Sequence, residues 1–200
     1  MGRRSEHSPE QIKAMALDAA AAIIHEEGLS HLSTRHIAKR MGYTAGTLYQ
    51  AFANLDDLVL QLNLRTIEGM AQALQGALQP QASPQENVRA MCRAYVAYGR
   101  EHRPQWELLF QRQWPEGFVY PAWYVAAMGK SLAAFEHELQ RLMGPKASSH
   151  QVTLAGRAVW CAMHGIHALY ASGRLEKLGV SKQDELLNFQ IDMVLKSLNA

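Results

Sequence analysis

The sequence is poor in cysteine and lacks any long apolar run. Only two of its 200 residues are cysteines, Cys92 and Cys161, and their spacing matches neither a metal motif nor a disulfide framework. No stretch reaches the roughly 18 consecutive apolar residues that a membrane-spanning helix needs. Two arginines near the start have no apolar segment behind them, so we expect no signal peptide. These absences exclude a disulfide-stapled scaffold and favour a cytoplasmic protein with no membrane partner.

Strand patterns and catalytic motifs are also missing. Apolar and polar residues do not alternate over strand-like lengths, and glycine and proline fall between helical segments. We find no nucleophile–base pair, no glycine-rich phosphate loop and no pair of carboxylates with suitable spacing. Hydrophobic residues nevertheless make up 48% of the chain, which is enough for a core without staples. We therefore expect an all-α protein that is not an enzyme and has no cofactor.

Apolar periodicity and capping residues predict about nine helices. Ser8, Pro9 and Gln11 form a helix start with a capping box, and Gly28 is well placed to end that helix. The other helices are expected at residues 34–41, 45–52, 54–78, 84–102, 104–113, 118–143, 149–173 and 181–198.

Acidic residues are absent from one segment, which runs from Gly28 to Leu55. The same segment contains Arg35, Lys39 and Arg40, so it is locally +3 in a chain whose formal net charge is only +2. Such an imbalance is typical of a surface that faces an anion, for example nucleic acid. Short imbalances of charge are also common in other proteins, so this pattern needs a motif beside it.

Two short helices in this segment are joined by a turn at residues 42–44. A glycine at the end of the first helix allows the sharp reversal of a helix-turn-helix. The second helix would expose Thr47, Tyr49 and Gln50, which can all hydrogen-bond, while its N-terminal amides favour a phosphate. In this motif the second helix enters the major groove of DNA. The alternative is a plain helical bundle in which the short helices only pack together.

This segment resembles the N-terminal domain of the TetR family of repressors over about residues 9–62. The matching residues are Thr34, Ile37 and Ala38 in the second helix, Gly42 at the turn, and Tyr49 and Phe52 at the end of the third helix. A shorter similarity, in Trp160, His164 and Gly165, is to the Trp-His-Gly signature of one C-terminal subgroup.

The resemblance implies a repressor with an N-terminal three-helix DNA-binding domain at residues 1–55. Residues 56–200 would form a larger helical domain that binds a ligand and dimerises. The DNA contacts implied are Thr34, Arg35, Tyr43, Thr44, Gly46, Thr47, Tyr49 and Gln50. Arg3 and Arg4 would add phosphate or minor-groove contacts as a flexible arm. Many members of the family have a phosphate-binding lysine where this chain has Leu55, so one phosphate contact and a little salt dependence would be lost.

Large aromatic residues gather in the second part of the chain, which contains all four tryptophans. Short helices around bulky rings can leave an apolar cleft for a small molecule, although each ring could equally be ordinary core. The residues expected to contact a ligand are Tyr95, Trp106, Phe110, Trp114, Trp123, Trp160, His164 and His167.

Cys161, His164 and His167 are spaced three residues apart and could hold a metal ion or a haem. No fourth ligand follows at a recognisable spacing, so we predict no metal. The alternatives are histidines that hydrogen-bond in the core or act as polar anchors for a ligand.

The last two helices have broad apolar faces and several small residues. In the family that the chain resembles, two such helices pair with their copies in a four-helix dimer interface. We therefore predict a homodimer that binds a palindromic operator in double-stranded DNA, since two half-sites match a two-fold axis. A small, mostly apolar effector would release it. The alternative is that both helices bury only against their own domain.

Overall fold

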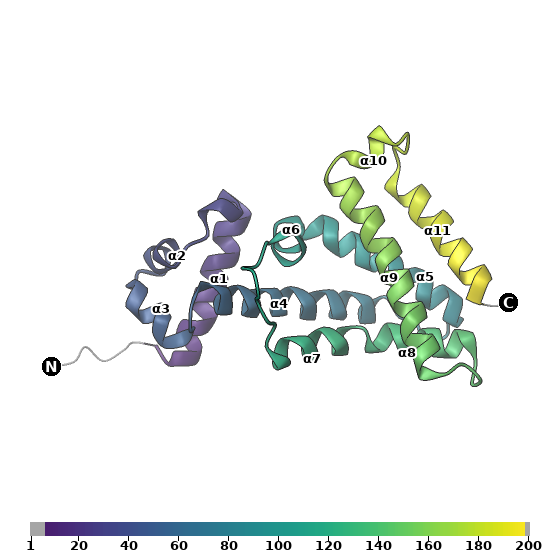
Figure 1. Cartoon of the computed structure of the whole chain (residues 1–200), viewed down its shortest axis with the longest axis horizontal. Coiled ribbons are helices and arrows are strands. Elements are labelled where there is room, and N and C mark those ends of the chain that lie inside the picture. Colours follow the sequence, from purple (N-terminus) through teal and green to yellow (C-terminus); the bar gives the residue numbers. More distant parts are fainter. Residues whose placement is uncertain (1–6, 199–200) are drawn as a thin grey trace. The chain divides into compact units, whose positions relative to one another are not determined.

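The computed structural model describes residues 7–198, and these residues are all-α (Figure 1). They form eleven α-helices and one short 3-10 helix, and no strand occurs within this range. The helices are α1 (Pro9–Glu27), η1 (Leu29–His31), α2 (Thr34–Met41), α3 (Ala45–Ala51), α4 (Leu55–Gly76), α5 (Pro84–Glu101), α6 (Arg103–Gln111), α7 (Ala122–Ser131), α8 (Ala133–Met143), α9 (Ser149–Ala171), α10 (Arg174–Lys177) and α11 (Gln183–Leu198). The predicted fold class is confirmed, and the predicted number of helices is close to the observed one.

The helix predicted at residues 118–143 is wrong in detail, because this region contains two helices, α7 and α8. Residues 112–121 are not helical. Pro115 and Pro121 disfavour helical backbone at and before their own positions, and Gly117 has a φ of +75°. A further short helix, α10, follows Gly173, whose left-handed backbone separates it from α9. No helix within residues 7–198 is both long and apolar enough to cross a membrane.

The chain divides into two compact units. Unit 1 consists of residues 7–66 and 103–124, and unit 2 consists of residues 67–102 and 125–198. Helix α4 is continuous and contributes its first part to unit 1 and its second part to unit 2. This division describes packing alone. The functional boundary predicted from the sequence, at residue 55, stays a prediction.

Unit 1 is built around the first three helices. Ser8 and Gln11 form the predicted capping box at the start of α1, with Gln11 N–H donating to Ser8 Oγ at 3.3 Å. The core of the unit comes from α1, α2, α3, the first part of α4 and α6. Its most deeply buried side chains include Ile23, Ile37, Leu48, Leu58 and Leu108.

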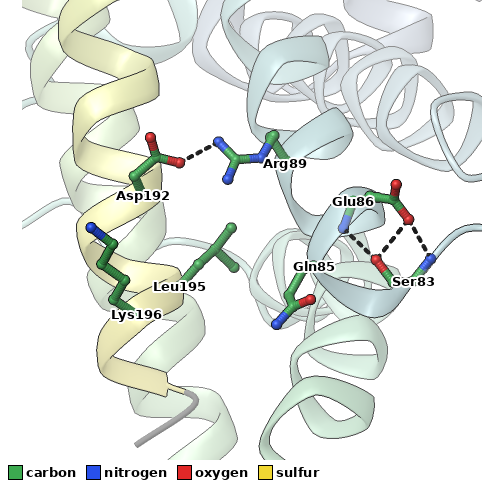
Figure 2. A pocket seen from close by; sticks show the side chains of 7 residues that line it. All are labelled: Ser83, Gln85, Glu86, Arg89, Asp192, Leu195 and Lys196. Atoms are coloured by element: carbon green, nitrogen blue, oxygen red, sulfur yellow. Dashed lines mark hydrogen bonds and ion pairs between the residues drawn. The ribbon is translucent and has the colours of Figure 1, made fainter.

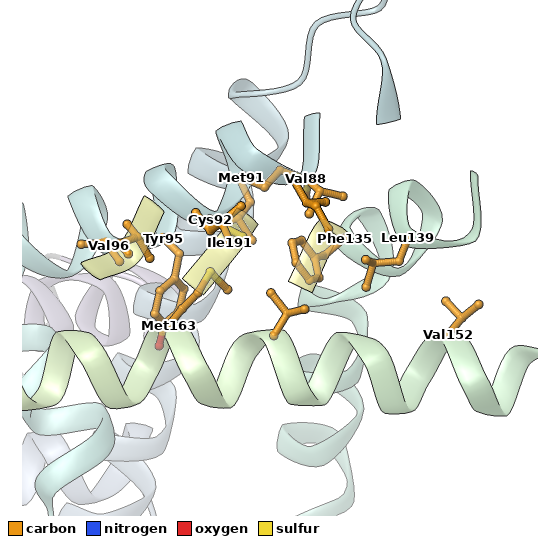
Figure 3. Close-up of a cluster of buried hydrophobic side chains, with 14 residues drawn as sticks. Val88, Met91, Cys92, Tyr95, Val96, Phe135, Leu139, Val152, Met163 and Ile191 are labelled. Carbon is orange, nitrogen blue, oxygen red and sulfur yellow. The ribbon is translucent and has the colours of Figure 1, made fainter. Parts of the chain in front are cut away.

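Unit 2 is a bundle in which α5, α8, α9 and α11 share one core. Figure 3 shows side chains of these helices meeting between them, with Met91 and Tyr95 from α5, Phe135 from α8, Met163 from α9 and Ile191 from α11. Helices α9 and α11 pack against each other and run side by side in Figure 1.

Two glycines let helices of unit 2 come unusually close. A Cβ placed on Gly99 in α5 would lie 2.5 Å from Nε2 of His167 in α9, which is far inside van der Waals contact. A Cβ on Gly69 in α4 would lie 2.5 Å from the hydroxyl of Tyr98. The neighbouring positions 98 and 99 of α5 therefore set its distance to two different helices.

Candidate nucleic-acid interface

Helices α2 and α3 form the predicted helix-turn-helix. Ser33 caps α2, since its hydroxyl accepts from the N–H of His36 at 3.2 Å. Gly42 ends α2 in the left-handed conformation, with a φ of +75°. Other residue types adopt this conformation only at a cost. The N–H of Tyr43 then donates to the carbonyl of Ala38 at 2.9 Å, which closes the turn before α3 begins.

The outer face of α3 is polar and open. Thr44, Gly46, Tyr49 and Gln50 are exposed, and Tyr49 keeps 57% of its surface although it is a large aromatic residue. Thr47 is partly exposed, and its hydroxyl lies 3.3 Å from that of Thr44. The N–H of Thr47 donates to the carbonyl of Thr44 at 3.0 Å, so this amide, one of those expected to favour a phosphate, already has a partner inside the protein.

The positive charges of this segment are of two kinds. Arg40 pairs with Glu26 at 2.6 Å and with Glu27 at 3.4 Å, and its hydrogen bond to Glu26 raises its pKa. Arg35 and Lys39 are exposed, and neither belongs to an ion pair in the described part of the chain. The local charge of +3 counted from the sequence therefore leaves two cations facing solvent, because α1 neutralises the third.

Two other predicted contacts lie at the start of α2 and at the turn. Thr34 is the first residue of α2 and is partly exposed. Tyr43 is also partly exposed, and a hydrogen bond of 2.7 Å joins its hydroxyl to Nδ1 of His7. This bond places the beginning of the described chain beside the turn. The predicted contacts Arg3 and Arg4 lie outside the described residues.

The start of α4 is held by its own polar side chains. Asn54 Oδ1 accepts from the N–H of Asp57 at 2.8 Å, and Asp57 Oδ2 accepts from the N–H of Ala53 at 2.9 Å. Asp56 pairs with Arg112. Leu55, at the position where many family members have lysine, is partly buried against the core of unit 1.

Four residues predicted to contact a ligand lie in unit 1. Trp106 is buried and packs against Phe110, with 5.0 Å between the ring centroids. Trp114 stacks on Phe118 at 4.4 Å. Trp123 is exposed and meets Tyr124 edge to face.

The other four predicted ligand contacts lie in unit 2. A hydrogen bond of 2.9 Å joins the hydroxyl of buried Tyr95 to Nδ1 of His164, and Trp160 stacks on the His164 ring. Burial lowers the pKa of His164. His167 is buried, and its Nδ1 lies 3.1 Å from the side-chain nitrogen of Gln183. The eight residues therefore fall into two groups, one in each unit.

The alternative metal site at Cys161, His164 and His167 is not formed. Cys161 is exposed, whereas His164 bonds to Tyr95 and His167 is buried. Within residues 7–198, no group of three or more potential ligands from histidine, cysteine, aspartate and glutamate is arranged to hold a metal ion.

Two buried polar residues of α4 were not predicted from the sequence. Asn63 and Thr66 are almost wholly inaccessible to solvent. The hydroxyl of Thr66 donates to the carbonyl of Leu62. Burial raises the pKa of Tyr124 to about 12, and a side-chain hydrogen bond with Asn63 acts in the opposite direction. The sequence pattern that could have predicted their burial is that both lie, one helical turn apart, on the apolar stripe of α4 that also contains Val59 and Ile67.

A groove of about 410 Å³ opens on unit 2 (Figure 2). Figure 2 shows that an ion pair of 2.6 Å between Arg89 of α5 and Asp192 of α11 lies within it. The other side chains that line it are Ser83, Gln85, Glu86, Leu195 and Lys196. Most of the lining is polar or charged, and none of the predicted ligand contacts takes part. It does not resemble the apolar pocket expected for the ligand.

Family models match both parts of the chain. Residues 16–62 match the model described as bacterial regulatory proteins, tetR family. Residues 88–194 match the model described as the tetracyclin repressor-like C-terminal domain. A search of curated proteins gave no match. The similarity to the Trp-His-Gly subgroup stays a prediction.

Several solved structures have the same fold. A Rhodococcus sp. RHA1 protein of unknown function is 19% identical over 100% of both chains, with a TM-score of 0.78. A putative tetR family transcription regulator from Shewanella sp. PV-4 is 18% identical and covers 93% of this chain and 97% of its own, with a TM-score of 0.66. The TetR family regulator PfmR from Thermus thermophilus is 21% identical and covers 90% and 97%, with a TM-score of 0.61.

Proposed function

The chain belongs to the TetR family of DNA-binding transcription regulators, and from this we propose that it is a homodimeric repressor located in the cytoplasm. A small, mostly apolar molecule releases this repressor from a palindromic operator. Members of this family are generally not enzymes. The observation that carries the proposal is the outer face of the helix-turn-helix, where polar side chains and two cations face solvent.

The exposed residues divide by the part of DNA that suits them. Gln50 and Tyr49 lie on the outer face of α3, the helix that enters the major groove in this motif, where an amide can bond an adenine edge. Arg35, Lys39 and the threonine hydroxyls suit phosphate oxygens, which fix the register of the protein on the duplex. The internal pairs of Arg40 remove it from this second group.

A dimer is supported by two uncovered apolar faces in unit 2. Leu154 of α9 keeps 61% of its surface, and Phe189 and Met193 of α11 keep 63% and 53%. Ala158 and Cys161 extend the exposed face of α9. Large apolar residues gathered on two neighbouring helices indicate a protein–protein interface. A second copy of the same two helices is the partner that the family resemblance implies.

Helix α4 is the element through which effector binding would change DNA binding. It starts directly after the helix-turn-helix, and the same unbroken helix continues into unit 2. A repressing dimer would hold its two recognition helices about 34–36 Å apart, which is one turn of DNA. An effector that binds more tightly to a dimer with another spacing shifts the population of dimers toward that spacing, and the dimers leave the DNA. The shift in free energy is no larger than the effector's difference in binding free energy between the two spacings.

The test is selection of binding sites from a library of random duplex DNA with the purified full chain. We expect enrichment of a palindrome with half-sites one helical turn apart, and binding that weakens steeply as salt is raised. A Tyr49→Ala, Gln50→Ala double variant should lose the preference for that palindrome. Enrichment of no sequence, or of a single unrepeated half-site, would contradict the proposal.

A further inference from the structure

A hydrogen bond of 2.7 Å joins the side chains of His7 and Tyr43, which are 36 positions apart in the chain. It lies between Nδ1 of the His7 ring and the Tyr43 hydroxyl, and the two rings also meet edge to face, with 6.2 Å between their centroids. Both side chains are partly exposed. The bond therefore links the segment just before α1 to the turn of the helix-turn-helix at the surface of unit 1.

The backbone on each side of this bond is held by local hydrogen bonds. Ser8, directly after His7, caps α1: its hydroxyl accepts from the N–H of Gln11 at 3.3 Å, and its own N–H donates to Gln11 Oε1 at 2.7 Å. The N–H of Tyr43 donates to the carbonyl of Ala38 at 2.9 Å. Because both backbone segments are fixed in this way, the contact between the two side chains is a defined feature of this surface.

The Tyr43 hydroxyl has one proton to donate and two lone pairs with which to accept. Among the described residues, its hydrogen bond is the one to His7. A phosphate oxygen only accepts, so it gains a bond from Tyr43 only when the hydroxyl proton points outward. The direction of the bond to His7 decides this, because a hydroxyl that donates to the ring has no proton left for DNA.

The protonation state of the His7 ring sets that direction. In a neutral histidine one ring nitrogen donates and the other accepts, so Nδ1 is able to accept the Tyr43 proton. In the charged ring both nitrogens donate. Nδ1 then donates to the Tyr43 oxygen, and the hydroxyl proton is left for a phosphate. Histidine is the side chain whose charge normally changes between pH 5 and 8.

The neighbouring elements give this surface a positive charge. The titratable and charged groups that the first turns of α1, all of α2 and all of α3 contain are Glu10, Lys13, Arg35, His36, Lys39, Arg40 and Tyr49. Glu10 accepts from the Ser8 hydroxyl at 2.9 Å, and Arg40 is paired with α1. The exposed cations that remain disfavour a further charge on His7, whereas the phosphates of DNA favour one. DNA binding should therefore be accompanied by proton uptake.

We propose that His7 is a positioning residue of the DNA interface: its ring takes up a proton from solvent as DNA binds, and the Tyr43 hydroxyl is then turned to donate to a phosphate oxygen. This inference rests on the proposed function, since it presumes that Tyr43 lies against DNA. Proton and DNA each raise the affinity of the protein for the other, because the coupling between two binding events is reciprocal. DNA binding is then tighter at acidic pH.

The test is fluorescence anisotropy with a labelled duplex of mixed sequence, because a phosphate contact does not depend on the bases. At constant ionic strength, we expect the wild-type chain to bind about three- to tenfold more tightly at pH 6 than at pH 8. His7→Asn keeps a side-chain donor next to Tyr43 but does not titrate. It should bind at pH 8 at least as tightly as the wild type, and its affinity should change several-fold less with pH.

Two further variants separate the bond from the general effect of histidine charges. Tyr43→Phe keeps the ring and removes the hydroxyl, so it should bind several-fold more weakly than the wild type at pH 6 and respond to pH as weakly as His7→Asn. His25→Asn removes an exposed histidine of α1 and is the matched control. It should keep the wild-type response to pH. Thermal unfolding checks that each variant is folded.

Calorimetry gives a readout that a merely structural role would not change. Titration of the duplex at pH 7 in two buffers with different enthalpies of ionisation counts the protons that are taken up on binding. We expect the wild type to take up more protons than His7→Asn, by at most one for each bound protomer. An equal count in both proteins would show that His7 only packs against Tyr43.

The two proposals fail separately. Equal responses to pH in the wild type and in His7→Asn overturn the inference, and so does a full wild-type response in Tyr43→Phe. If either result appears although the wild type enriches a palindrome, only the role of His7 fails. If the response to pH depends on His7 and Tyr43 but no sequence is enriched, the role of His7 stands and the proposed palindromic repressor fails.

Discussion

Arg35 and Arg40 are five positions apart on one helix, yet only Arg40 forms ion pairs with another helix. Arg40 reaches back to two carboxylates of α1 and so joins two helices of unit 1. Arg35 is exposed and takes part in no ion pair of the described residues. A phosphate therefore competes with existing partners at Arg40 and with water alone at Arg35.

Replacing Arg35 by alanine should weaken DNA binding several-fold at all sequences, because a phosphate contact carries no base information. The slope of log affinity against log salt should become shallower by about 1. Fluorescence anisotropy across a salt series measures both. Arg40→Ala is the control and should leave the slope nearly unchanged. A larger loss of slope in Arg40→Ala than in Arg35→Ala would contradict the assignment.

His164 provides a prediction about pH. Burial lowers its pKa in the folded protein from the ordinary value of 6.5, because the charged ring is poorly solvated beside Tyr95 and Trp160. Above pH 6.5 the ring is neutral in both the folded and unfolded chains, so its contribution is fully present. As the pH falls through that value, the unfolded chain takes up a proton first, and the free energy of unfolding falls.

We therefore expect the free energy of unfolding in urea to fall less for His164→Gln than for the wild type between about pH 7.5 and 5.5. His150→Gln, a change at an exposed position, should keep the wild-type dependence. Parallel pH profiles for the wild type and His164→Gln would show that His164 does not contribute.

At the scale of the element, α5 owes its position to two adjacent residues. Gly99 admits His167 of α9, and Tyr98 lies against Gly69 of α4. The His167 ring is buried and bonded to Gln183, so it has little freedom to withdraw. The absence of a side chain at Gly99 is thus a packing requirement, since its backbone is ordinary helix.

Gly99→Ala should destabilise the protein by about 1–3 kcal/mol, because the added methyl group overpacks against a fixed ring. Gly129→Ala in α7 is the matched control. A Cβ there meets no atom within 4 Å, and alanine favours helix over glycine by up to about 1 kcal/mol. Thermal unfolding should show opposite signs for the two variants. Equal melting temperatures would mean that α9 moves away at little cost.

At the scale of the whole molecule, the proposed assembly depends on the exposed apolar faces of α9 and α11. Leu154 and Phe189 keep most of their surface, although residues of their type are usually buried. A second copy that covered them would remove a large apolar area from water, at roughly 25 cal/mol for each Å².

The double variant Leu154→Asp, Phe189→Asp should therefore be monomeric in light scattering where the wild type is dimeric. It should also bind a palindromic site more weakly, because each half-site would then be bound separately. Val119→Asp makes the same kind of change at an exposed position of unit 1 and should stay dimeric. A dimeric double variant would place the interface elsewhere.

Local chemistry explains which elements were predictable. Several helix ends are defined by bonds to residues a few positions away, namely those at Ser8, Gly28, Ser33 and Gly42. Each of these boundaries can therefore be predicted from a short stretch of sequence. A break between residues 113 and 118 was predicted, but the structure extends it to residues 112–121, and the division of residues 118–143 into α7 and α8 was missed. The aromatic residues were foreseen as a group, but their separation into two units depends on contacts between distant segments.

Apolar periodicity, helix caps and one left-handed glycine were enough to predict the all-α class, the helix-turn-helix and its exposed polar face from the sequence. Only the folded chain shows that α1 neutralises Arg40, that Gly99 must lack a side chain, and that buried Asn87 bonds to Gln79 and Glu138. The physical reason is that these properties belong to pairs of groups far apart in the chain. The sequence on either side of Arg40 or Gly99 does not show which distant group that residue meets.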